Sequence, residues 1–349
     1  MAEKTTSAAG AANTVNTGTN WTCYDSSTMT AREIYGRTLA EMAKEDKRIV
    51  ALTADLEKST ALNKFSAVHP DRCFNVGIAE QNMFGAAAGM AKTGLVPFAS
   101  TFAIMACLRG GEQIRTDIAY QKLPVKIIAT HSGISFGHAG TTHHCTEDFA
   151  IMRSMANMTV ICPADGIETS KAVRACMDID GPVYMRIGRG FEPPVYEDED
   201  YDFEIGKATV MREGTDLTII TCGIGVLQSV NAAKTLAERD GISVRVVNMH
   251  TIKPIDAAAV VESVEKTGKI LTIEEHNIVG GLGDAVASVI AENGLACTFK
   301  KHGLYDEFSM IGYAEDLYSH YKLDSNGIAE IVRELLGIAV EDDDDWEDE

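Results

Sequence analysis

Four of the nine histidines in this 349-residue chain lie within one short loop, a concentration that is typical of a polar site. They are His131, His138, His143 and His144, in the sequence HSGISFGHAGTTHH. The loop follows VKIIAT, an apolar run that predicts a buried strand. Because open α/β sheets bind ligands beyond the carboxyl ends of their strands, we expect this loop to line a binding site.

Glu80 is a second candidate for chemistry, since it stands where a predicted strand turns into a helix. The segment reads NVGIAEQNM and continues into GAAAG, whose small residues allow another backbone to approach closely. A carboxyl group at this place can take part in acid–base chemistry. The simpler alternative is that it only complements the helix dipole.

Three other motifs are typical of binding sites by residue type, and a simpler interpretation competes with each. Gly223–Gly225 opens a predicted helix as a dinucleotide fingerprint would, but Gln228 occupies the third glycine position. Gly280–Gly283 lacks the Lys and the Ser or Thr of a phosphate loop. The consecutive residues 143–145 are His, His and Cys, yet neighbours in a chain rarely face one ion. We expect tight turns at the glycines and no metal site.

Short apolar strands alternate with helices along the chain, and this pattern predicts parallel sheets that are covered on both faces. The predicted strands are RIVALTAD, RCFNVG, VPFAST, VKIIATHSG, MTVICPAD and PVYMRIGR, followed by LTIITCG, ISVRVVNM and KILTIEEH. The helices predicted after the acidic run are 226–238, 256–266, 282–293 and about 326–336. The sequence therefore predicts an α/β fold with two tandem domains and mainly parallel sheets.

The composition of the chain indicates where the two domains and the tails begin and end. Residues 1–28 are rich in Thr, Ala, Asn, Gly and Ser without periodicity, which is typical of a disordered tail. An acidic linker at 195–204 separates a first domain at 29–194 from a second at 205–338. The last residues, 339–349, form an acidic tail that we expect to be solvated.

The net charge of −20 argues against nucleic acid or an anionic membrane as a partner. Fourteen of the 51 acidic residues lie in the linker and the C-terminal tail, so the rest of the chain is only mildly acidic and can hold a local anion site. The eight cysteines include no CxxC pair, and we find neither a signal peptide nor a membrane-spanning run. We expect a cytoplasmic protein with reduced thiols.

Eight segments match motifs of the transketolase family in the family's order: ALTADLEKST, VGIAEQNMFGAAAGMA, VPFASTF, EQIRTDIAY, VKIIATHSGI, TTHH, PADGIET and YMRIGR. Residues 32–189 resemble its thiamine pyrimidine-binding domain, and residues 205–337 resemble its C-terminal domain. The family holds Mg²⁺ and the cofactor diphosphate with a Gly-Asp-Gly motif that this sequence lacks. The chain thus resembles the C-terminal subunit of a split, two-chain transketolase.

The resemblance implies thiamine diphosphate as cofactor, with Mg²⁺ held mainly by an N-terminal partner subunit. It also implies a heterotetramer of two copies of each chain, because transketolase is a two-fold dimer with the cofactor at its interface. The implied reaction moves a two-carbon ketol unit from a ketose phosphate to an aldose phosphate, as in the pentose phosphate pathway of carbohydrate metabolism.

Matching motifs assign roles to individual residues by resemblance. Glu80 corresponds to the glutamate that hydrogen-bonds and activates the aminopyrimidine of the cofactor. Phe102 corresponds to the aromatic residue that stacks on the pyrimidine ring, and Asp55 to an aspartate that contacts the cofactor. His143 corresponds to a catalytic histidine near the hydroxyl and carbonyl groups of the donor.

The resemblance also implies a phosphate site made of four residues that are far apart in the sequence. These are Arg32, Ser59, His131 and Arg189. The arginines could bind a phosphate through two parallel hydrogen bonds each. Only the fold could bring these four residues together.

Two departures from the family pattern affect the expected substrate. Ala139 precedes Gly140 where transketolases usually have Asp-Gly, and that Asp contacts a sugar hydroxyl. His138 could compensate in part. Met105 occupies a position where an aromatic residue often completes the pyrimidine pocket. The identities of the donor and acceptor sugars therefore stay open, as does the pathway.

Other classes of function compete with ketol transfer. The beta subunit of a 2-oxoacid dehydrogenase has a similar length and domain order, and a deoxyxylulose-phosphate synthase-like half is another thiamine enzyme. A scaffold subunit with relic residues is the non-enzyme alternative. The joint presence of Glu80, Phe102 and His143 argues against that last interpretation.

Overall fold

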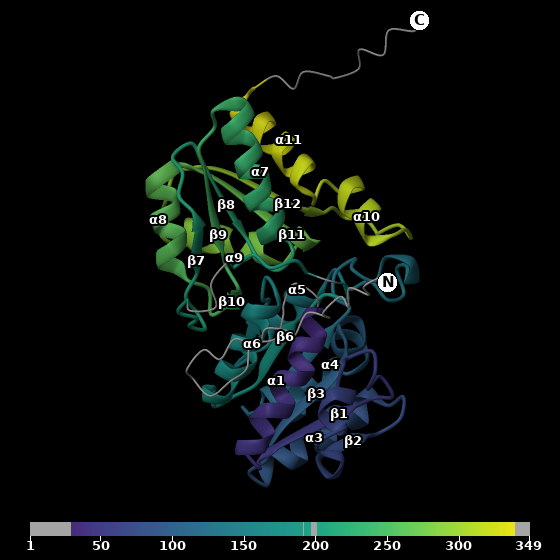
Figure 1. Cartoon of the computed structure of the whole chain (residues 1–349). Helices are drawn as coiled ribbons and strands as arrows, with labels where there is room; N and C mark the ends of the chain where they lie inside the picture. Colours follow the sequence, from purple (N-terminus) through teal and green to yellow (C-terminus); the bar gives the residue numbers. More distant parts are fainter. Residues whose placement is uncertain (1–28, 191, 197–200, 339–349) are drawn as a thin grey trace, which may run out of the picture.

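Figure 1 shows the computed structural model, which describes residues 29–190, 192–196 and 201–338. Two α/β domains lie one above the other in this view, and this confirms the predicted fold class. The expected tails at 1–28 and 339–349, and part of the expected acidic linker, lie outside the described residues. Within the described ranges, no helix is long and apolar enough to cross a membrane.

The sheet of the first domain has seven strands in the order β10-β5-β6-β4-β3-β1-β2. Their bounds are β1 Ile49–Thr53, β2 Cys73–Asn75, β3 Val96–Phe102, β4 Lys126–Thr130, β5 Thr159–Ile161, β6 Val183–Arg186 and β10 Thr251–Lys253. All neighbours are parallel except β10, which pairs antiparallel with β5. Strand β10 comes from the segment assigned to the second domain, so each domain contributes to this sheet.

Helices cover both faces of the first sheet. The helical segments are α1 Ala31–Glu45, α2 Asn63–Ser66, α3 Glu80–Lys92, α4 Gly111–Gln113, α5 Asp148–Ser154 and α6 Gly166–Ala175, with π-helical turns at Met105–Arg109 and Ile114–Ala119 and 3₁₀ turns at Pro70–Arg72, Gly137–Ala139 and Cys176–Asp178. The start of α6 forms half of a capping box. Asp165 accepts from the Glu168 backbone N–H, but the Glu168 carboxylate accepts from Ala164 rather than from Asp165, because it also faces the second domain.

The second sheet has five strands in the order β12-β11-β8-β9-β7, all parallel except β7. Its elements are β7 Thr209–Arg212, β8 Leu217–Thr221, β9 Val244–Asn248, β11 Lys269–Asn277 and β12 Thr298–Leu304, with α7 Gly225–Asp240, α8 Ala257–Thr267, α9 Leu282–Glu292, α10 Ala314–His320 and α11 Ser325–Leu336. The four predicted helices correspond to α7, α8, α9 and α11. Elements β7, β10, β12 and α10 were not predicted.

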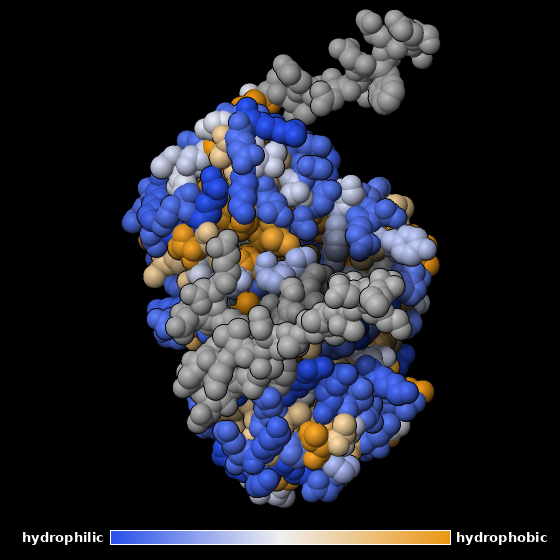
Figure 2. Space-filling model, in the orientation of Figure 1, coloured by the Kyte–Doolittle hydropathy of each residue, from blue (hydrophilic) through white to orange (hydrophobic). Residues whose placement is uncertain are grey.

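One hydrophobic core extends through both domains. It joins side chains of α3 and β3 in the first domain, such as Phe84 and Ala99, to side chains of the second domain such as Ile220 and Val286. On the face shown in Figure 2, hydrophilic residues cover most of both domains, while hydrophobic residues are visible in the band where the domains meet. The domains therefore hold a fixed relative position through burial of apolar surface.

Buried charges reinforce this interface. Arg186 at the end of β6 is only 2% exposed, and its guanidinium lies 3.3 Å from Asp148 and 3.8 Å from Glu275 of β11. It also donates to the backbone oxygen of Glu275 at 2.5 Å. The two acids raise the pKa of Arg186 well above its ordinary value against the opposing effect of burial, so the guanidinium stays charged. This ion-paired cluster links β6 of the first sheet to β11 of the second.

Candidate active site

The predicted site residues follow the strands of the first sheet at one edge. Asp55 comes after β1, Phe102 ends β3, His131 comes directly after β4, and Arg189 comes shortly after β6. Because these strands run parallel, their carboxyl ends meet at the same edge of the sheet. The fold thus brings together residues that are far apart in the sequence.

Aromatic and histidine rings form a cluster at this edge. The ring centroids of Phe102 and His131 are 4.0 Å apart. Phe136 lies edge-on to both, at 5.6 Å from Phe102 and 4.8 Å from His131. His143 adds a further ring 5.3 Å from Phe136 and 6.2 Å from Phe102. Phe136 is the centre of this cluster, although no role was predicted for it.

The two predicted phosphate arginines lie beside the ring cluster. Arg32, in the first turn of α1, donates to the backbone oxygen of Ser59 at 2.6 Å. The guanidinium of Arg189 stacks over the ring of Phe136 at 4.9 Å, and its backbone N–H donates to the Ser135 hydroxyl at 3.1 Å. These contacts hold both guanidinium groups in place.

Two positive charges, those of Arg32 and Arg189, act on the groups of this site. Burial lowers the pKa of Arg32, the carboxylate of Glu192 raises it, and the positive charge of Arg189 lowers it again. Burial, followed by the charges of Arg32 and Arg189 and by His143, lowers the pKa of His131 to about 3. His131 is therefore neutral, and it can donate or accept a hydrogen bond without adding charge.

Glu80 begins α3 and is 5% exposed. Its carboxylate accepts from Arg109 at 3.1 Å, and the Arg109 side chain is 52% exposed. Together they line a surface cavity of about 510 Å³ with Leu108 and Ile78, which are 62% and 76% exposed. Arg109 was not predicted, because an ion-pair partner from a separate turn leaves no signal in a single sequence.

Asp55 adopts a left-handed backbone with φ of 63° and pairs with Asn75 at the end of β2. The backbone N–H of Asp55 donates to the Asn75 side-chain oxygen at 3.0 Å, and the Asn75 amide donates back to the carboxylate at 3.3 Å. Among the described residues, neither Asp55 nor Glu80 forms a hydrogen bond, ion pair or ring contact with the ring cluster. The three predicted cofactor residues Asp55, Glu80 and Phe102 therefore have separate partners in this structure.

The histidine loop is anchored by the second domain. His144 lies 2.6 Å from the Ser309 hydroxyl through Nδ1 and 3.0 Å from the Gly137 oxygen through Nε2, so it is structural. The Thr141 hydroxyl donates to the Ser309 backbone oxygen at 2.9 Å. Ala139 ends the 3₁₀ turn of this loop, and the exposed His138 packs edge-on against Phe136. The second domain thus positions the loop of the first.

The glycine motif at 280–283 binds a carboxyl group of the chain itself. The Glu274 carboxylate accepts from the backbone N–H groups of Leu282 and Gly283 at 2.6 and 2.9 Å, at the start of α9. A Cβ at Gly281 would collide with the same carboxylate. The helix N-terminus that could bind a phosphate is therefore occupied by a side chain of the chain itself.

The candidate zinc residues have separate partners. His143 contacts Thr142, His144 contacts Ser309, and Cys145 forms a backbone bridge with Gly133. In the part of the chain that the structure describes, no group of three His, Cys, Asp or Glu side chains could hold a metal ion.

The residues around Glu80 fit the pyrimidine half of thiamine diphosphate. A carboxylate can hydrogen-bond a ring nitrogen, and the exposed Ile78 and Leu108 side chains can contact an aromatic ring. The metal that accompanies the diphosphate is usually bound by carboxylate and other oxygen ligands, and among the described residues no group of three His, Cys, Asp or Glu side chains could hold it.

Two family models match the chain in tandem. The transketolase pyrimidine binding domain matches residues 27–192, and the transketolase C-terminal domain matches residues 206–328. These matched ranges contain all the predicted site residues.

Curated relatives and a solved structure match over nearly their whole lengths. A putative transketolase C-terminal section of Methanocaldococcus jannaschii is 45% identical over 87% of this chain and 96% of its own. One of the subunits of an apulose-4-phosphate transketolase of Phocaeicola vulgatus is 38% identical over 87% of this chain and 97% of its own. The structure described as a split gene transketolase, inactive beta4 tetramer, has a TM-score of 0.81 at 43% identity and covers 89% of this chain and 99% of that chain. This chain therefore belongs to the transketolase family and corresponds to the C-terminal section of a split transketolase.

Proposed function

We propose that this chain is the C-terminal subunit of a two-chain transketolase that moves a two-carbon ketol unit from a ketose phosphate to an aldose phosphate. The observation that supports this most strongly is the pair of positioned guanidinium groups, Arg32 and Arg189, beside the neutral His131 and the ring of Phe102. A 2-oxoacid dehydrogenase subunit has no phosphorylated sugar for these cations to bind.

Each group has a role that follows from its chemistry. Thiamine diphosphate, when bound, supplies the nucleophilic carbon needed to cleave a bond beside a ketone. Glu80 holds a hydrogen bond to the ring nitrogen of the pyrimidine, and Phe102 offers a ring face. His143, partly buried beside Phe136, hydrogen-bonds the oxygens of the donor and moves a proton there.

The phosphate end of the substrate binds at the side of the ring cluster where the two arginines lie. Arg32 and Arg189 neutralise its charge, and Ser59 and His131 add neutral hydrogen bonds. Because both arginines are already held by other contacts, little side-chain entropy is lost when a phosphate binds.

An N-terminal subunit completes the site by holding the diphosphate and Mg²⁺. The related beta4 tetramer is described as inactive, which supports the same need for a partner here. Exposed apolar residues beside Glu80, namely Ile78 and Leu108, suit burial under that partner. We expect two copies of each chain in the assembly.

The donor sugar differs from that of common transketolases. Ala139 lies in the active-site loop where an Asp would contact a hydroxyl group, and one relative is named for apulose 4-phosphate. We infer that the donor lacks the hydroxyl configuration which that Asp selects.

The test is a ketol-transfer assay on the native complex purified from its own cells. We expect transfer from a ketose phosphate, with xylulose 5-phosphate as the reference donor, to ribose 5-phosphate that requires thiamine diphosphate and Mg²⁺ and travels with a second chain. Oxidative decarboxylation of a 2-oxoacid without ketol transfer would overturn the proposal. Pyruvate condensation with glyceraldehyde 3-phosphate would point to the synthase reaction instead.

A further inference from the structure

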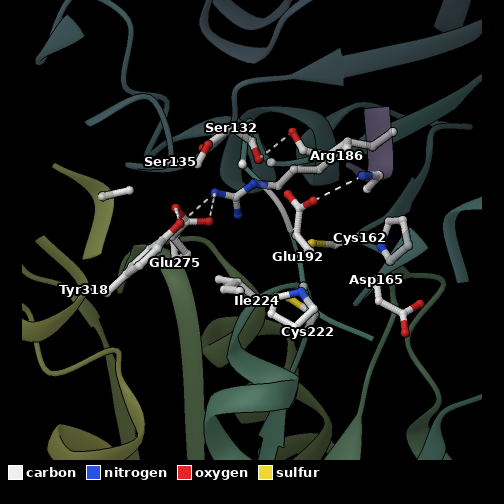
Figure 3. A pocket seen from close by; sticks show the side chains of 18 of the residues that line it. Ser132, Ser135, Cys162, Asp165, Arg186, Glu192, Cys222, Ile224, Glu275 and Tyr318 are labelled. Carbon is white, nitrogen blue, oxygen red and sulfur yellow. Dashed lines mark hydrogen bonds and ion pairs between the residues drawn. The ribbon is translucent and has the colours of Figure 1, made fainter. Parts of the chain in front are cut away.

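A cavity of about 360 Å³ lies between the two domains (Figure 3). Its walls come from the ends of β5 and β6 in the first domain and from the β8–α7 turn, β11 and α10 in the second. Two cysteines line it, Cys162 directly after β5 and Cys222 directly after β8. The thiols therefore belong to different domains and open on the same space.

The two thiols lie close to each other. The Cys162 thiol acts on the pKa of Cys222, and a Cβ built on Gly223, the residue after Cys222, would lie 2.8 Å from the Cys162 sulfur. The backbone fixes this proximity. Cys162 donates its N–H to the His250 oxygen at 2.8 Å, while Met249 donates to the oxygen of Thr221 at 2.7 Å. The chain directly after β5 and the end of β8 are thus hydrogen-bonded to the consecutive residues Met249 and His250.

Some groups around the two thiols favour the reactive thiolate, and others oppose it. The side chain of Arg186 extends across the cavity toward Glu275 in Figure 3, and its charge favours the thiolate of Cys222. The neighbouring Cys162 and burial raise the pKa of Cys222, and Arg186 lowers it. Oxidation is therefore expected to be slow at neutral pH and to become faster as the pH rises.

We propose that Cys162 and Cys222 form a peroxide-sensitive dithiol site that closes to a disulfide between the two domains. One thiolate attacks hydrogen peroxide and becomes a sulfenic acid, and the released hydroxide takes a proton to give water. The second thiol then attacks that sulfur and displaces a second water. In total, two thiols lose two electrons and two protons, and one peroxide is reduced to two waters.

A second thiol pair provides an internal comparison. The Cys107 thiol likewise acts on the pKa of Cys145, but both residues belong to the first domain and neither is among the residues that line the cavity. If proximity alone decided reactivity, both pairs would oxidise equally. Because a small oxidant can reach Cys162 and Cys222 through the cavity, we expect that pair to react first.

Trypsin separates the two cavity cysteines, which makes the experiment direct. Cleavage after Arg153, Lys171, Arg212 and Lys234 leaves Cys162 alone in residues 154–171 and Cys222 alone in residues 213–234. The full-length chain, alone and with its native partner, is treated with hydrogen peroxide, alkylated, digested and analysed by mass spectrometry without reduction. We expect these two peptides joined, with a mass lower by two hydrogen atoms than their sum.

Rate and reversibility give further readouts. The Cys162–Cys222 link is expected to form at least about tenfold faster than any Cys107–Cys145 link, to form faster at higher pH, and to disappear with dithiothreitol. The control variant Cys107→Ser retains the link, whereas Cys222→Ser loses it. Free, alkylated Cys162 and Cys222 after peroxide treatment, or a link between other cysteines first, would overturn the proposal. The result of this disulfide experiment does not depend on which sugar the enzyme uses.

Discussion

The carboxylate of Glu80 is almost buried and has one charged partner among the described residues, Arg109, whose guanidinium is half exposed. An incoming pyrimidine can share this carboxylate without displacing a buried group. Arg109 therefore keeps Glu80 oriented toward the cavity before a cofactor binds, which makes it a positioning residue in the proposed function.

Substitution of Glu80 tests that role. We expect Glu80→Gln to lower the turnover of the assembled complex by at least about 100-fold, because the amide is a poor substitute for a carboxyl group in proton transfer. The control is Glu112→Gln, an exposed acid on the nearby α4, which should leave turnover unchanged. The measurement is the initial rate at saturating cofactor and substrate. Turnover within a few-fold of wild type for Glu80→Gln would contradict the assignment.

Glu192 is a second residue whose effect on substrate binding can be measured. Its carboxylate accepts from the Ala31 backbone N–H at 3.3 Å and acts on the charge of Arg32. Burial raises the pKa of Glu192 to about 7, while Arg32 lowers it and Glu275 raises it. Above this pH the carboxylate is charged and competes with a substrate phosphate for Arg32; below it the carboxyl group is neutral.

We therefore expect the KM for the sugar phosphate to be lower in Glu192→Gln than in wild type above about pH 7, with the difference vanishing below it. A factor of about 3 to 10 is the expected size for one screened charge. Comparison of the two proteins at each pH cancels the titration of the phosphate itself. An equal KM ratio at every pH would show that Glu192 acts only through packing.

At the scale of elements, the start of α9 depends on a side chain from β11. Glu274 is fully buried and satisfies two backbone N–H groups that would otherwise lack partners. We expect Glu274→Ala to lower the free energy of unfolding by about 1–3 kcal/mol, because the two donors stay buried without an acceptor. Urea denaturation measures this, and the exposed Glu292→Ala on the same helix serves as control. A change equal to that of the control would contradict the capping role.

The elements differ in how well the sequence predicts them. Long apolar runs such as ISVRVVNM predict central strands correctly, because burial on both faces leaves a continuous hydrophobic pattern. Strand β12 reads TFKKHGL and lies at an edge, so its half-polar pattern has no clear period. Strand β10 has three residues and is defined only by its pairing with β5 of the other domain.

The residues of the candidate site also differ in how well the sequence predicts them. Residues 80, 102 and 131 could be placed at strand ends from local pattern, and the family motifs suggested their roles. Arg109, Phe136 and Glu192 act through contacts with residues distant in the sequence, so a single sequence gives no signal for them.

At the scale of the whole molecule, buried titratable groups make stability depend on pH in opposing ways. Burial raises the pKa of Glu168 and Glu274 to about 7, so their protonated forms are favoured in the folded chain and their contribution is lost as the pH rises through 7. Burial lowers the pKa of His131 to about 3 and of His250 and His276 to about 4. Their contribution is present above an unfolded pKa of about 6.5 and is lost as the pH falls.

Substitution of one buried acid tests this pH dependence of stability. Glu168 accepts from Asn248 of β9 at 3.0 and 3.1 Å and from the Tyr196 hydroxyl at 2.9 Å, so it connects both domains. We expect the free energy of unfolding of Glu168→Gln, relative to wild type, to rise by about 1–3 kcal/mol as the pH increases from about 5 to about 8. Urea denaturation at several pH values measures it. Parallel curves for the two proteins would contradict this account.

The position of β10 has a consequence for engineering. A chimera built from two relatives is usually cut at the linker between domains, which would here join a first domain from one parent to a second domain from another. Because β10 completes the first sheet by pairing with β5, such a hybrid would place one parent's edge strand on the other parent's sheet. Recombination of substrate-binding and assembly traits in this branch of enzymes therefore requires residues 251–253 to be exchanged together with the first domain.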